Sequence, residues 1–253
     1  MSQLQRNVVV TGASKGIGRA IAERFAASGH RVWALARSKD ALDSLAAAYP
    51  GRVVAMAVDI ERVDAVLDAC AQLRSEGPPD VLVNNAGVAV SAPLRKTSLE
   101  DYERLMAVNV RAPFLFCREL SEAMAERGSG RIINIASTAG LKGFRYTSAY
   151  CASKHALVGM TRSLALELAS RQVTVNAVCP GWTDTEMVTR SAETISRTTG
   201  KTTDEARETL ARMNPMGRLV QPSEVAELCH FLASDAAGAI TGATYSIDAG
   251  ETI

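Results

Sequence analysis

Tyr150 and Lys154 lie four residues apart in a stretch with helical periodicity, so both side chains are expected on one face of a helix. A free tyrosine has a pKa of about 10, which is too high for fast proton exchange near neutral pH. A nearby ammonium group favours the phenolate and lowers that pKa. The pair therefore predicts an acid/base centre in which Lys154 acidifies Tyr150 and Tyr150 protonates a reacting oxygen.

Two further polar residues fit the same centre. Ser137 follows an apolar stretch typical of a buried strand, and its hydroxyl can stabilise charge on the same oxygen. Asn109 is the fourth candidate. Taken singly, each has a commoner explanation: a surface pair for the tyrosine and lysine, a strand-end cap for Ser137, and a turn or helix-bend residue for Asn109. Their joint occurrence with a nucleotide-binding turn favours a catalytic group.

That turn is the segment 11–18, TGASKGIG, which connects an apolar strand pattern to a helix pattern. Its glycines allow a tight turn and a close approach of the backbone to a pyrophosphate. The start of the helix supplies free N–H groups and a partial positive charge. This context predicts a dinucleotide site. The turn residues expected to contact the dinucleotide are Gly12, Ser14, Lys15, Gly16, Ile17 and Gly18.

The end of the second expected strand indicates which dinucleotide binds. An Asp or Glu there would bind the adenosine 2′-hydroxyl, but this chain has Ala36 followed by Arg37. A guanidinium can hold a phosphate by two hydrogen bonds, and Lys15 adds a second cation. The pattern favours NADP(H) over NAD(H). The alternative is that Arg37 is a solvated loop charge.

Short runs rich in Val and Ile alternate with amphipathic stretches along the whole chain. This alternation predicts an α/β fold: a single doubly wound parallel sheet with helices on both faces, in one domain over residues 1–253. The polar, Thr-rich segment 182–214 is expected to form a lid over the active site. Ser223 is a candidate cap for a late helix. The expected strands are Asn7–Thr11, Arg31–Ala36, Val53–Val58, Val81–Asn84, Arg131–Ala136, Val173–Ala177 and Thr244–Asp248, and the expected helices include Gly18–Ser28, Ser148–Ser170 and Ser223–Ala233.

Composition excludes several other classes of protein. The chain has 253 residues, 47% of them hydrophobic, and a formal net charge of +1, which gives no sign of a nucleic-acid or membrane-surface partner. No apolar run reaches the roughly 20 residues of a membrane helix. No secretory signal is visible, and the five cysteines are scattered, so a reduced, cytoplasmic location is expected. Three dispersed histidines argue against a metal site.

The spacing Gly-x3-Gly-x-Gly resembles the short-chain dehydrogenase/reductase family, and ordered motifs extend the resemblance from end to end. The resemblance implies a seven-stranded sheet, a homotetramer or dimer built on two long helices, and a catalytic tetrad. In that tetrad, Lys154 would also hold the nicotinamide ribose, and Asn109 would hold a water linking Lys154 to solvent. The tetrad matches Asn109, Ser137, Tyr150 and Lys154; the adenine-side residues match Asp59, Ile60, Asn85, Ala86 and Gly87; the residues beside the nicotinamide match Pro180, Gly181 and Thr183.

Within that family, the chain is most similar to 3-oxoacyl thioester reductases, acting on acyl carrier protein or coenzyme A, and to aromatic polyketide ketoreductases. The resemblance implies reduction of a 3-oxoacyl thioester to the 3-hydroxyacyl thioester. Arg127 and Arg171 fall close to positions where such reductases dock an acidic carrier, and paired arginines at the rim of the cleft would aid encounter. Alternatively, Arg171 is a cation at the end of a helix, where it interacts favourably with the helix dipole. Phe144 and Trp182 are expected to line the substrate pocket.

Two alternatives remain open. The same tetrad serves oxidation of 3-hydroxyacyl-CoA, 3-hydroxybutyrate or another secondary alcohol, usually with NAD, although the missing acid near position 36 argues against NAD. A non-catalytic dinucleotide-binding protein would keep the glycine turn and lose part of the tetrad, whereas all four members are present here.

Overall fold

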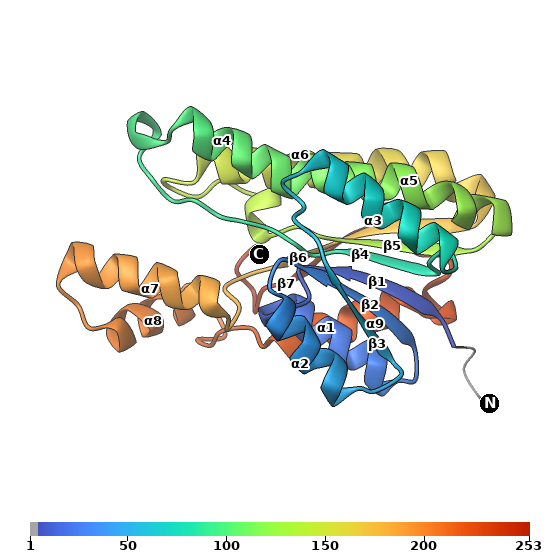
Figure 1. Cartoon of the computed structure of the whole chain (residues 1–253). Coiled ribbons are helices and arrows are strands. Elements are labelled where there is room, and N and C mark those ends of the chain that lie inside the picture. The colour runs from blue at the N-terminus through green and yellow to red at the C-terminus, as the bar shows by residue number, and fades with distance from the viewer. Residues whose placement is uncertain (1–4) are drawn as a thin grey trace.

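Seven parallel strands form one twisted sheet in the order β3-β2-β1-β4-β5-β6-β7, in a computed structural model that describes residues 5–253 (Figure 1). The chain proceeds outward from β1 to β3 and then returns to β4, which pairs with β1 on its other side. The expected doubly wound parallel sheet is confirmed. The strands are β1 Asn7–Thr11, β2 Arg31–Ala36, β3 Val53–Ala57, β4 Val81–Asn84, β5 Gly130–Ile135, β6 Val173–Pro180 and β7 Thr244–Ile247.

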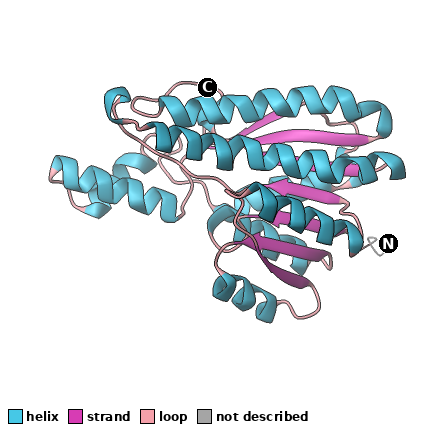
Figure 2. Cartoon of the chain, turned by 45° about the horizontal axis from the view of Figure 1, so that its top comes forward, coloured by secondary structure: helices cyan, strands magenta, loops and turns pink. Residues whose placement is uncertain are grey.

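Helices cover both faces of the sheet (Figures 1 and 2). Alternate residues of a strand point to opposite faces, so Val8 and Val10 of β1 enter one core and Val9 enters the other. The first core packs against α1, α2 and α9, and the second against α3, α5 and α6. These helices are α1 Gly16–Ala27, α2 Lys39–Ala48, α3 Val63–Ser75, α5 Ala112–Arg127, α6 Ser148–Leu168 and α9 Pro222–Ala233.

The helical stretch from Leu99 to Arg127 changes its winding in the middle. It consists of α4 (Leu99–Met106), the π-helical turn η2 (Ala107–Arg111) and α5. In an α-helix the Asn109 carbonyl would accept from the N–H of residue 113, but that residue is Pro113 and has no N–H. The proline therefore favours the local π winding, and Asn109 lies within that turn.

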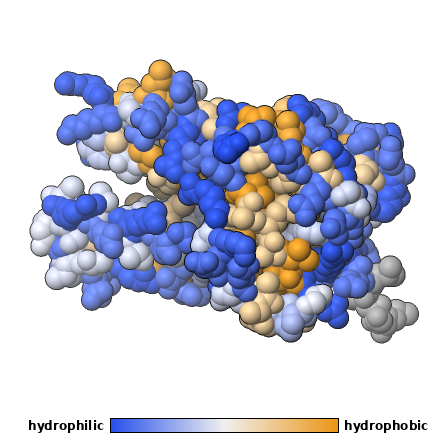
Figure 3. Space-filling model, in the orientation of Figure 1, coloured by the Kyte–Doolittle hydropathy of each residue, from blue (hydrophilic) through white to orange (hydrophobic). Residues whose placement is uncertain are grey.

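Residues 182–214, which we call the arm, hold α7 (Glu186–Thr199) and α8 (Thr203–Ala211). A capping box between Thr202 and Glu205 starts α8. The two helices bury a small core of their own, which Trp182 contacts. Figure 1 shows the arm leaving the sheet at the side where β6 ends and lying opposite α4, and Figure 3 shows a hollow between these two lobes. The arm core consists of Val188, Ala192, Ala206, Leu210 and Leu219.

The start of α9 differs from the sequence expectation. Pro222 occupies the first helical turn, where its missing N–H costs nothing, so the cap lies one residue earlier, at Gln221. Gln221 and Glu224 form the reciprocal capping bonds, and the Gln221 N–H donates to Glu224 Oε2 at 2.7 Å. Ser223 is therefore not the cap. Short 3-10 turns complete the fold: η1 Leu94–Lys96, η3 Thr138–Gly140, η4 Ala169–Arg171 and η5 Asp235–Ala237.

In the described part of the chain, the helices are all too short or too polar to cross a membrane. Over the same residues, His, Cys, Asp and Glu side chains do not gather in threes in a way that could hold a metal ion.

Candidate active site

The sequence-predicted site residues meet at one edge of the sheet because the strands are parallel and their carboxyl ends lie together. We call this the carboxyl edge, and the opposite one the amino edge. The π turn and the start of α6 approach the carboxyl edge from the side. The strand ends deliver Gly12 after β1, Arg37 after β2, Asp59 after β3, Asn85 after β4, Ser137 after β5 and Gly181 after β6.

The glycine turn between β1 and α1 is shaped for a close ligand. Gly12 has a φ of +68°, and a Cβ there would lie 2.8 Å from the Cα of Ala86. A Cβ on Gly18 would lie 2.3 Å from the Gly12 carbonyl oxygen. Lys15 is the N-cap of α1 but makes no side-chain cap bond, and the first turn carries no acidic residue. The first N–H groups of α1 are thus available to an anion, as a pyrophosphate requires.

Thr11 and Asn85 hold this turn in place. The Thr11 hydroxyl accepts from the N–H groups of Asn85 and Ala86, each at 3.0 Å, and Asn85 Nδ2 donates to the Thr11 carbonyl at 2.9 Å. Sequence reasoning missed Thr11, although its place as the last residue of a buried strand marks it. The side chain of Asn85 is occupied by the turn itself, so its contribution to a dinucleotide site is to shape the cradle.

Two cations flank the turn. The Arg37 side chain is 62% exposed and lies 3.5 Å from its acidic neighbour Glu61, so its guanidinium is available to a phosphate. Lys15 forms an ion pair with Glu186 at the start of α7, and this pair joins the turn to the arm. Farther along the edge, Asp59 accepts from the Glu61 N–H at 3.2 Å and closes the turn after β3, with Ile60 packed below.

Tyr150, Lys154 and Ser137 come together at the carboxyl edge. Lys154 is 4% exposed, and its Nζ lies 5.9 Å from the centroid of the Tyr150 ring and donates to the Ile135 carbonyl at 2.9 Å. Ser137 lies close enough to Tyr150 to lower the pKa of its phenol. The Ala139 N–H donates to the Ser137 oxygen at 3.1 Å, which fixes the serine rotamer. A reacting oxygen between Ser137 and Tyr150 would meet two hydroxyl donors.

The electrostatics of this group differ from expectation in one respect. Burial raises the pKa of Tyr150, and Ser137 only partly opposes that effect. Burial also lowers the pKa of Lys154 to about 8. In the cofactor-free chain Lys154 does not offset the effect of burial on Tyr150, because its ammonium donates to the Ile135 carbonyl. Acidification of Tyr150 by Lys154 stays a prediction for the cofactor-bound enzyme. Tyr150 is held as a protonated acid.

Asn109 is fixed by its side chain. Its Oδ1 accepts from the Val88 N–H at 2.9 Å, and its Nδ2 donates to the Val88 carbonyl and to Ser153 Oγ at 2.9 and 3.0 Å. The Ser153 hydroxyl donates in turn to the Tyr150 carbonyl at 2.7 Å. Both N–H groups of the Asn109 amide and one lone pair of its oxygen are thus used within the chain. Sequence reasoning missed Ser153, which lies between Tyr150 and Lys154.

Gly87 lies beside both of these groups. A Cβ at this position would be 3.3 Å from Asn109 Oδ1, which is tight, and in ordinary contact with Lys154 Nζ at 3.5 Å. Pro180 ends β6, and a Cβ on the next residue, Gly181, would lie 2.9 Å from Asp248. The Thr183 hydroxyl donates to the Gly181 carbonyl at 2.9 Å. These residues lie at the carboxyl edge, as expected from the sequence.

The two candidate substrate residues occupy different surroundings. Phe144 is half-buried, and Lys142 Nζ lies 5.0 Å from the centroid of its ring. Trp182 is also half-buried, but its ring packs against the core of the arm, and its indole nitrogen is enclosed without a hydrogen-bond partner. Trp182 therefore connects the arm to the sheet in addition to any contact with substrate.

Arg127 and Arg171 do not lie at the rim of the cleft. Arg127 precedes β5 and Arg171 precedes β6, so both lie at the amino edge, whereas Ser137 follows β5. The six residues of β5 span roughly 20 Å between the two edges. Arg127 pairs with Asp80 at 3.2 Å, and Arg171 donates to the Ala125 carbonyl at 3.3 Å. The expected placement is wrong because motif spacing does not show at which end of a strand a residue lies.

An open cleft of about 760 Å³ lies between α8 and the start of α9, away from the tetrad. Its walls are charged and largely paired: Arg207 bonds to Asp184 and Arg218 bonds to Glu224. The chemistry-bearing residues line the carboxyl edge instead, so the size of this cleft does not mark the active site.

Known proteins match the chain over nearly its whole length. Residues 12–252 match a family model described as enoyl-(acyl carrier protein) reductase. Galactitol 2-dehydrogenase (L-tagatose-forming) from Cereibacter sphaeroides is 40% identical over 96% of this chain and 94% of its own. A 3-oxoacyl-[acyl-carrier-protein] reductase from Synechocystis sp. is 38% identical over 96% and 95%. A crystal structure of an actinorhodin polyketide ketoreductase variant with NADPH is similar at a TM-score of 0.93, with 36% identity over 98% and 97%.

Proposed function

Because the chain belongs to the short-chain dehydrogenase/reductase family, we propose that it reduces the carbonyl of a 3-oxoacyl thioester to the 3-hydroxyacyl thioester with NADPH. The acyl group would be carried on acyl carrier protein or coenzyme A. The observation that carries the proposal is the Ser137–Tyr150 pair beside buried Lys154, next to a glycine turn shaped for a pyrophosphate.

NADPH suits the residues at the carboxyl edge. The uncapped start of α1 accepts the pyrophosphate, and Arg37 with Lys15 can hold the 2′-phosphate. The similar ketoreductase structure contains NADPH. When bound, the reduced nicotinamide supplies the hydride that reaches the carbonyl carbon.

The protein's own side chains would stabilise the charge on the carbonyl oxygen and supply its proton. Ser137 donates a hydrogen bond to the carbonyl oxygen as negative charge develops there. Tyr150, kept protonated by burial, donates its phenolic proton to the same oxygen. Lys154 has a pKa of about 8, so near neutral pH it can deliver a proton to the phenolate and take one back from water. The backbone carbonyl of Asn109 is the acceptor we assign to that water.

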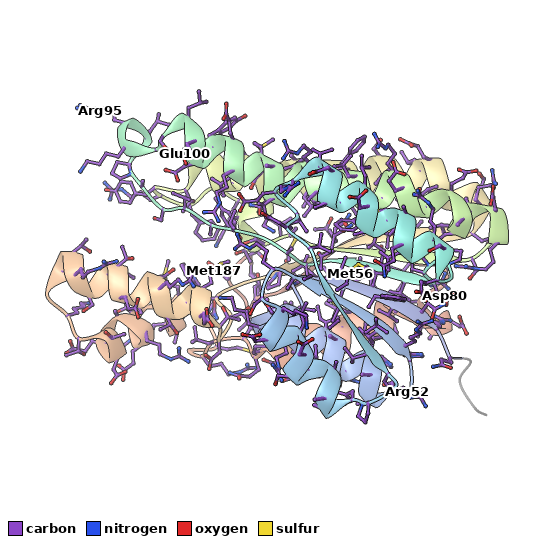
Figure 4. All side chains as sticks on the ribbon, viewed as in Figure 1. Arg52, Met56, Asp80, Arg95, Glu100 and Met187 are labelled. Atoms are coloured by element: carbon purple, nitrogen blue, oxygen red, sulfur yellow. The ribbon has the colours of Figure 1, made fainter. Side chains whose placement is uncertain are left out.

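The rim of the hollow supports an acyl substrate. Leu94 and Leu99, beside the start of α4, are 76% and 70% exposed, and Met187 at the start of α7 is also exposed. Figure 4 places Met187 on the side of the arm that faces the other lobe, and Arg95 at the tip of that lobe. Exposed apolar side chains on both sides of a hollow favour an apolar chain over a polyol, and a cation at the tip suits an acidic carrier.

A second candidate is the oxidation of a secondary alcohol, either a 3-hydroxyacyl-CoA, 3-hydroxybutyrate or a sugar alcohol. The 40% identical galactitol 2-dehydrogenase favours this direction and substrate class. The same Tyr150 would then accept the proton of the alcohol. A purely dinucleotide-binding protein is the least supported, because the tetrad is complete.

An initial-rate screen separates the candidates. NADPH and NADH would each be tested with acetoacetyl-CoA, a 3-oxoacyl carrier mimic and bulky cyclic ketones, and NADP⁺ and NAD⁺ with galactitol and 3-hydroxybutyrate. The proposal expects the highest kcat/KM with NADPH and a thioester. A larger kcat/KM for a polyol would support the second candidate, oxidation of a secondary alcohol. No turnover of any of these substrates, with NADPH still bound, would favour a non-catalytic dinucleotide-binding protein.

Assembly and location are part of the same proposal. Exposed apolar side chains on α4, α5 and α6, namely Tyr102, Phe114 and Leu166, support a homotetramer or dimer built on these helices. Light scattering on the purified protein tests this, and a monomer would contradict it. The five cysteines are free and buried, which fits a reducing, cytoplasmic location.

A further inference from the structure

Glu251, two residues from the C-terminus, is a buried acid that the proposed reaction does not use. Its side chain is 4% exposed. Figure 1 shows the C-terminus at the carboxyl edge, close to the base of the arm. A Cβ on Gly181 would lie 3.0 Å from Glu251 Oε2, so this carboxylate lies directly behind the turn that follows β6.

Lys142 connects Glu251 to one wall of the substrate pocket. Its Nζ donates to the backbone carbonyl of Glu251 and lies 4.0 Å from Oε1. The same ammonium lies 5.0 Å from the centroid of the Phe144 ring. The position of Glu251 therefore constrains the loop that carries Phe144 into α6.

Trp182 connects Glu251 to the other wall. The indole nitrogen of Trp182 and Oε2 of Glu251 are both buried, and each lacks a completed hydrogen bond. Both groups lie at the same turn, because a Cβ on Gly181, the residue before Trp182, would lie 3.0 Å from Glu251 Oε2. Trp182 also contributes to lowering the pKa of Glu251 against the larger raising effect of burial. Buried polar groups without partners are costly, so a small movement that joins them is favourable. The Trp182 ring packs on the arm core, so that movement would carry the arm.

The neighbouring acid Asp248 already has hydrogen-bond partners, so it is not the acid left to bond Trp182. Asp248, which ends the last strand, already accepts from the N–H groups of Gly250 and Thr252 at 3.0 and 2.9 Å and from the Thr252 hydroxyl. Asp248 raises the pKa of Glu251, while Thr138 and Lys142 lower it. Thr138, which directly follows Ser137, lies close enough to Glu251 to lower its pKa.

We propose that Glu251 is a positioning residue that sets both walls of the substrate pocket. It acts on Phe144 through Lys142, and on the arm through a Trp182 N–H···Glu251 hydrogen bond that forms when the arm closes over a substrate. This inference rests on the proposed function only in assigning the pocket to a carbonyl substrate. The contact between Trp182 and Glu251 can be measured without any turnover.

The first test uses fluorescence. The chain has two tryptophans, so a Trp33→Phe background leaves Trp182 as the single reporter. Its emission is expected to change with pH as Glu251 titrates, with a midpoint above the usual 4.5 because burial dominates. Glu251→Gln in the same background should abolish that change. Emission that titrates equally in both proteins, or in neither, would overturn the proposal.

The second test uses kinetics with the best substrate of the screen. Glu251→Leu and Trp182→Phe should each raise KM by roughly tenfold, which corresponds to one lost hydrogen bond, with kcat within about threefold. The double variant should be little worse than either single one, because both remove the same bond. Glu251→Gln retains an acceptor and should restore KM. In the parent, KM should rise as pH falls, since a protonated acid is the weaker acceptor, and Glu251→Gln should flatten that profile.

Control variants distinguish a positioning role of Glu251 from a general loss of folding. Glu76→Gln alters an exposed acid at the end of α3 and should leave KM and emission unchanged. NADPH affinity should be equal in all variants. If Glu251→Leu fails to fold, Trp182→Phe and Glu251→Gln still decide the matter. Equal loss of kcat and NADPH binding in the three variants would show that the residues only support the fold. A normal emission titration in a protein without carbonyl activity would overturn the proposed function and leave this inference standing.

Discussion

Charged groups at the two edges of the sheet have different surroundings. At the amino edge, charges from distant segments pair with one another: Arg6 bonds to Asp235, and Arg127 lies 3.2 Å from Asp80, which also accepts from the N–H of Asn7 at 2.7 Å. At the carboxyl edge, the Lys154 ammonium is bonded to a backbone carbonyl and, among residues 5–253, has no carboxylate partner. Figure 4 shows how far apart the two regions lie, with Asp80 at one end and Met187 at the other.

The difference shows where this molecule accepts an energetic penalty. An ammonium without a carboxylate partner destabilises the fold but can exchange a proton near neutral pH. Paired charges at the amino edge hold segments far apart in sequence and have little freedom to change protonation. The same strands thus carry proton chemistry at one end and structural support at the other, as expected when function costs stability.

The largest expected effect is at the carboxyl edge. Tyr150→Phe removes the acid and should lower kcat by roughly a thousandfold, within the range for general acid catalysis. NADPH binding and the melting temperature should change little. Tyr146→Phe, at an exposed tyrosine nearby, is the matched control and should retain activity. Substantial turnover by Tyr150→Phe with cofactor bound would refute the mechanism and remove the chemical distinction between the edges.

The second prediction concerns cofactor choice at the same edge. Arg37→Asp replaces a phosphate ligand with a repelling charge, so the ratio of NADPH to NADH affinity should fall by roughly tenfold to a hundredfold. Binding titrations of both cofactors measure this ratio. Arg52→Asp, at an exposed arginine before β3, should leave the ratio unchanged. Equal affinity of the parent for NADH and NADPH would contradict the assigned preference.

The third prediction tests the energetic penalty itself. Burial holds the Lys154 pKa at about 8, below the usual 10.5, so the unfolded chain binds more protons between these values, and the charged amine destabilises the fold at pH 7. Lys154→Met should therefore stabilise the cofactor-free protein by about 2 kcal/mol while activity is lost. Thermal melting at pH 7 measures this as a rise of roughly 5 °C. A lower melting temperature would show that the bond to Ile135 outweighs desolvation.

The smallest expected effect is at the amino edge. Burial lowers the pKa values of His30 and His230, whose rings lie 6.1 Å apart, below the usual 6.5. The unfolded chain then binds more protons as pH falls below about 6.5, so stability should decline there. The His30→Gln/His230→Gln double variant should weaken this decline in melts between pH 7 and pH 5, with kcat within about twofold of the parent. A large loss of activity would mean that the edges are coupled.

Much of the site follows from local sequence. Tyr150 and Lys154 share a face because four residues make about one helical turn. The glycines of the turn are needed where a Cβ would collide with backbone, as at Gly18. The sequence reveals all seven strands because each is a short apolar run, and β1, β2, β4, β5 and β6 are buried along most of their length. Only their ends shifted: β6 continues through Pro180 because Val178 and Cys179 still pair with β7.

Other features depend on contacts between distant segments. The arm helices are Thr-rich and stabilised by their own small core, so the polar composition of segment 182–214 does not reveal them. Arg127 and Arg171 matched a motif position yet lie at the other edge. The side chain of Asn109 is used by Val88, 21 residues earlier. Glu251 offers no local signal, since the groups beside it, Lys142 and Gly181, are distant in sequence.

The amino-acid sequence by itself therefore determined the alternation of strands and helices, the glycine turn, the shared face of Tyr150 and Lys154, and the cation after the second strand. All of these depend on residues within a few positions of one another. The tertiary structure decided which polar groups lose water and which find partners: the lowered pKa of Lys154, the protonated state of Tyr150 and the enclosed carboxylate of Glu251. Desolvation depends on every segment that packs around a group, and no local pattern in the chain records it.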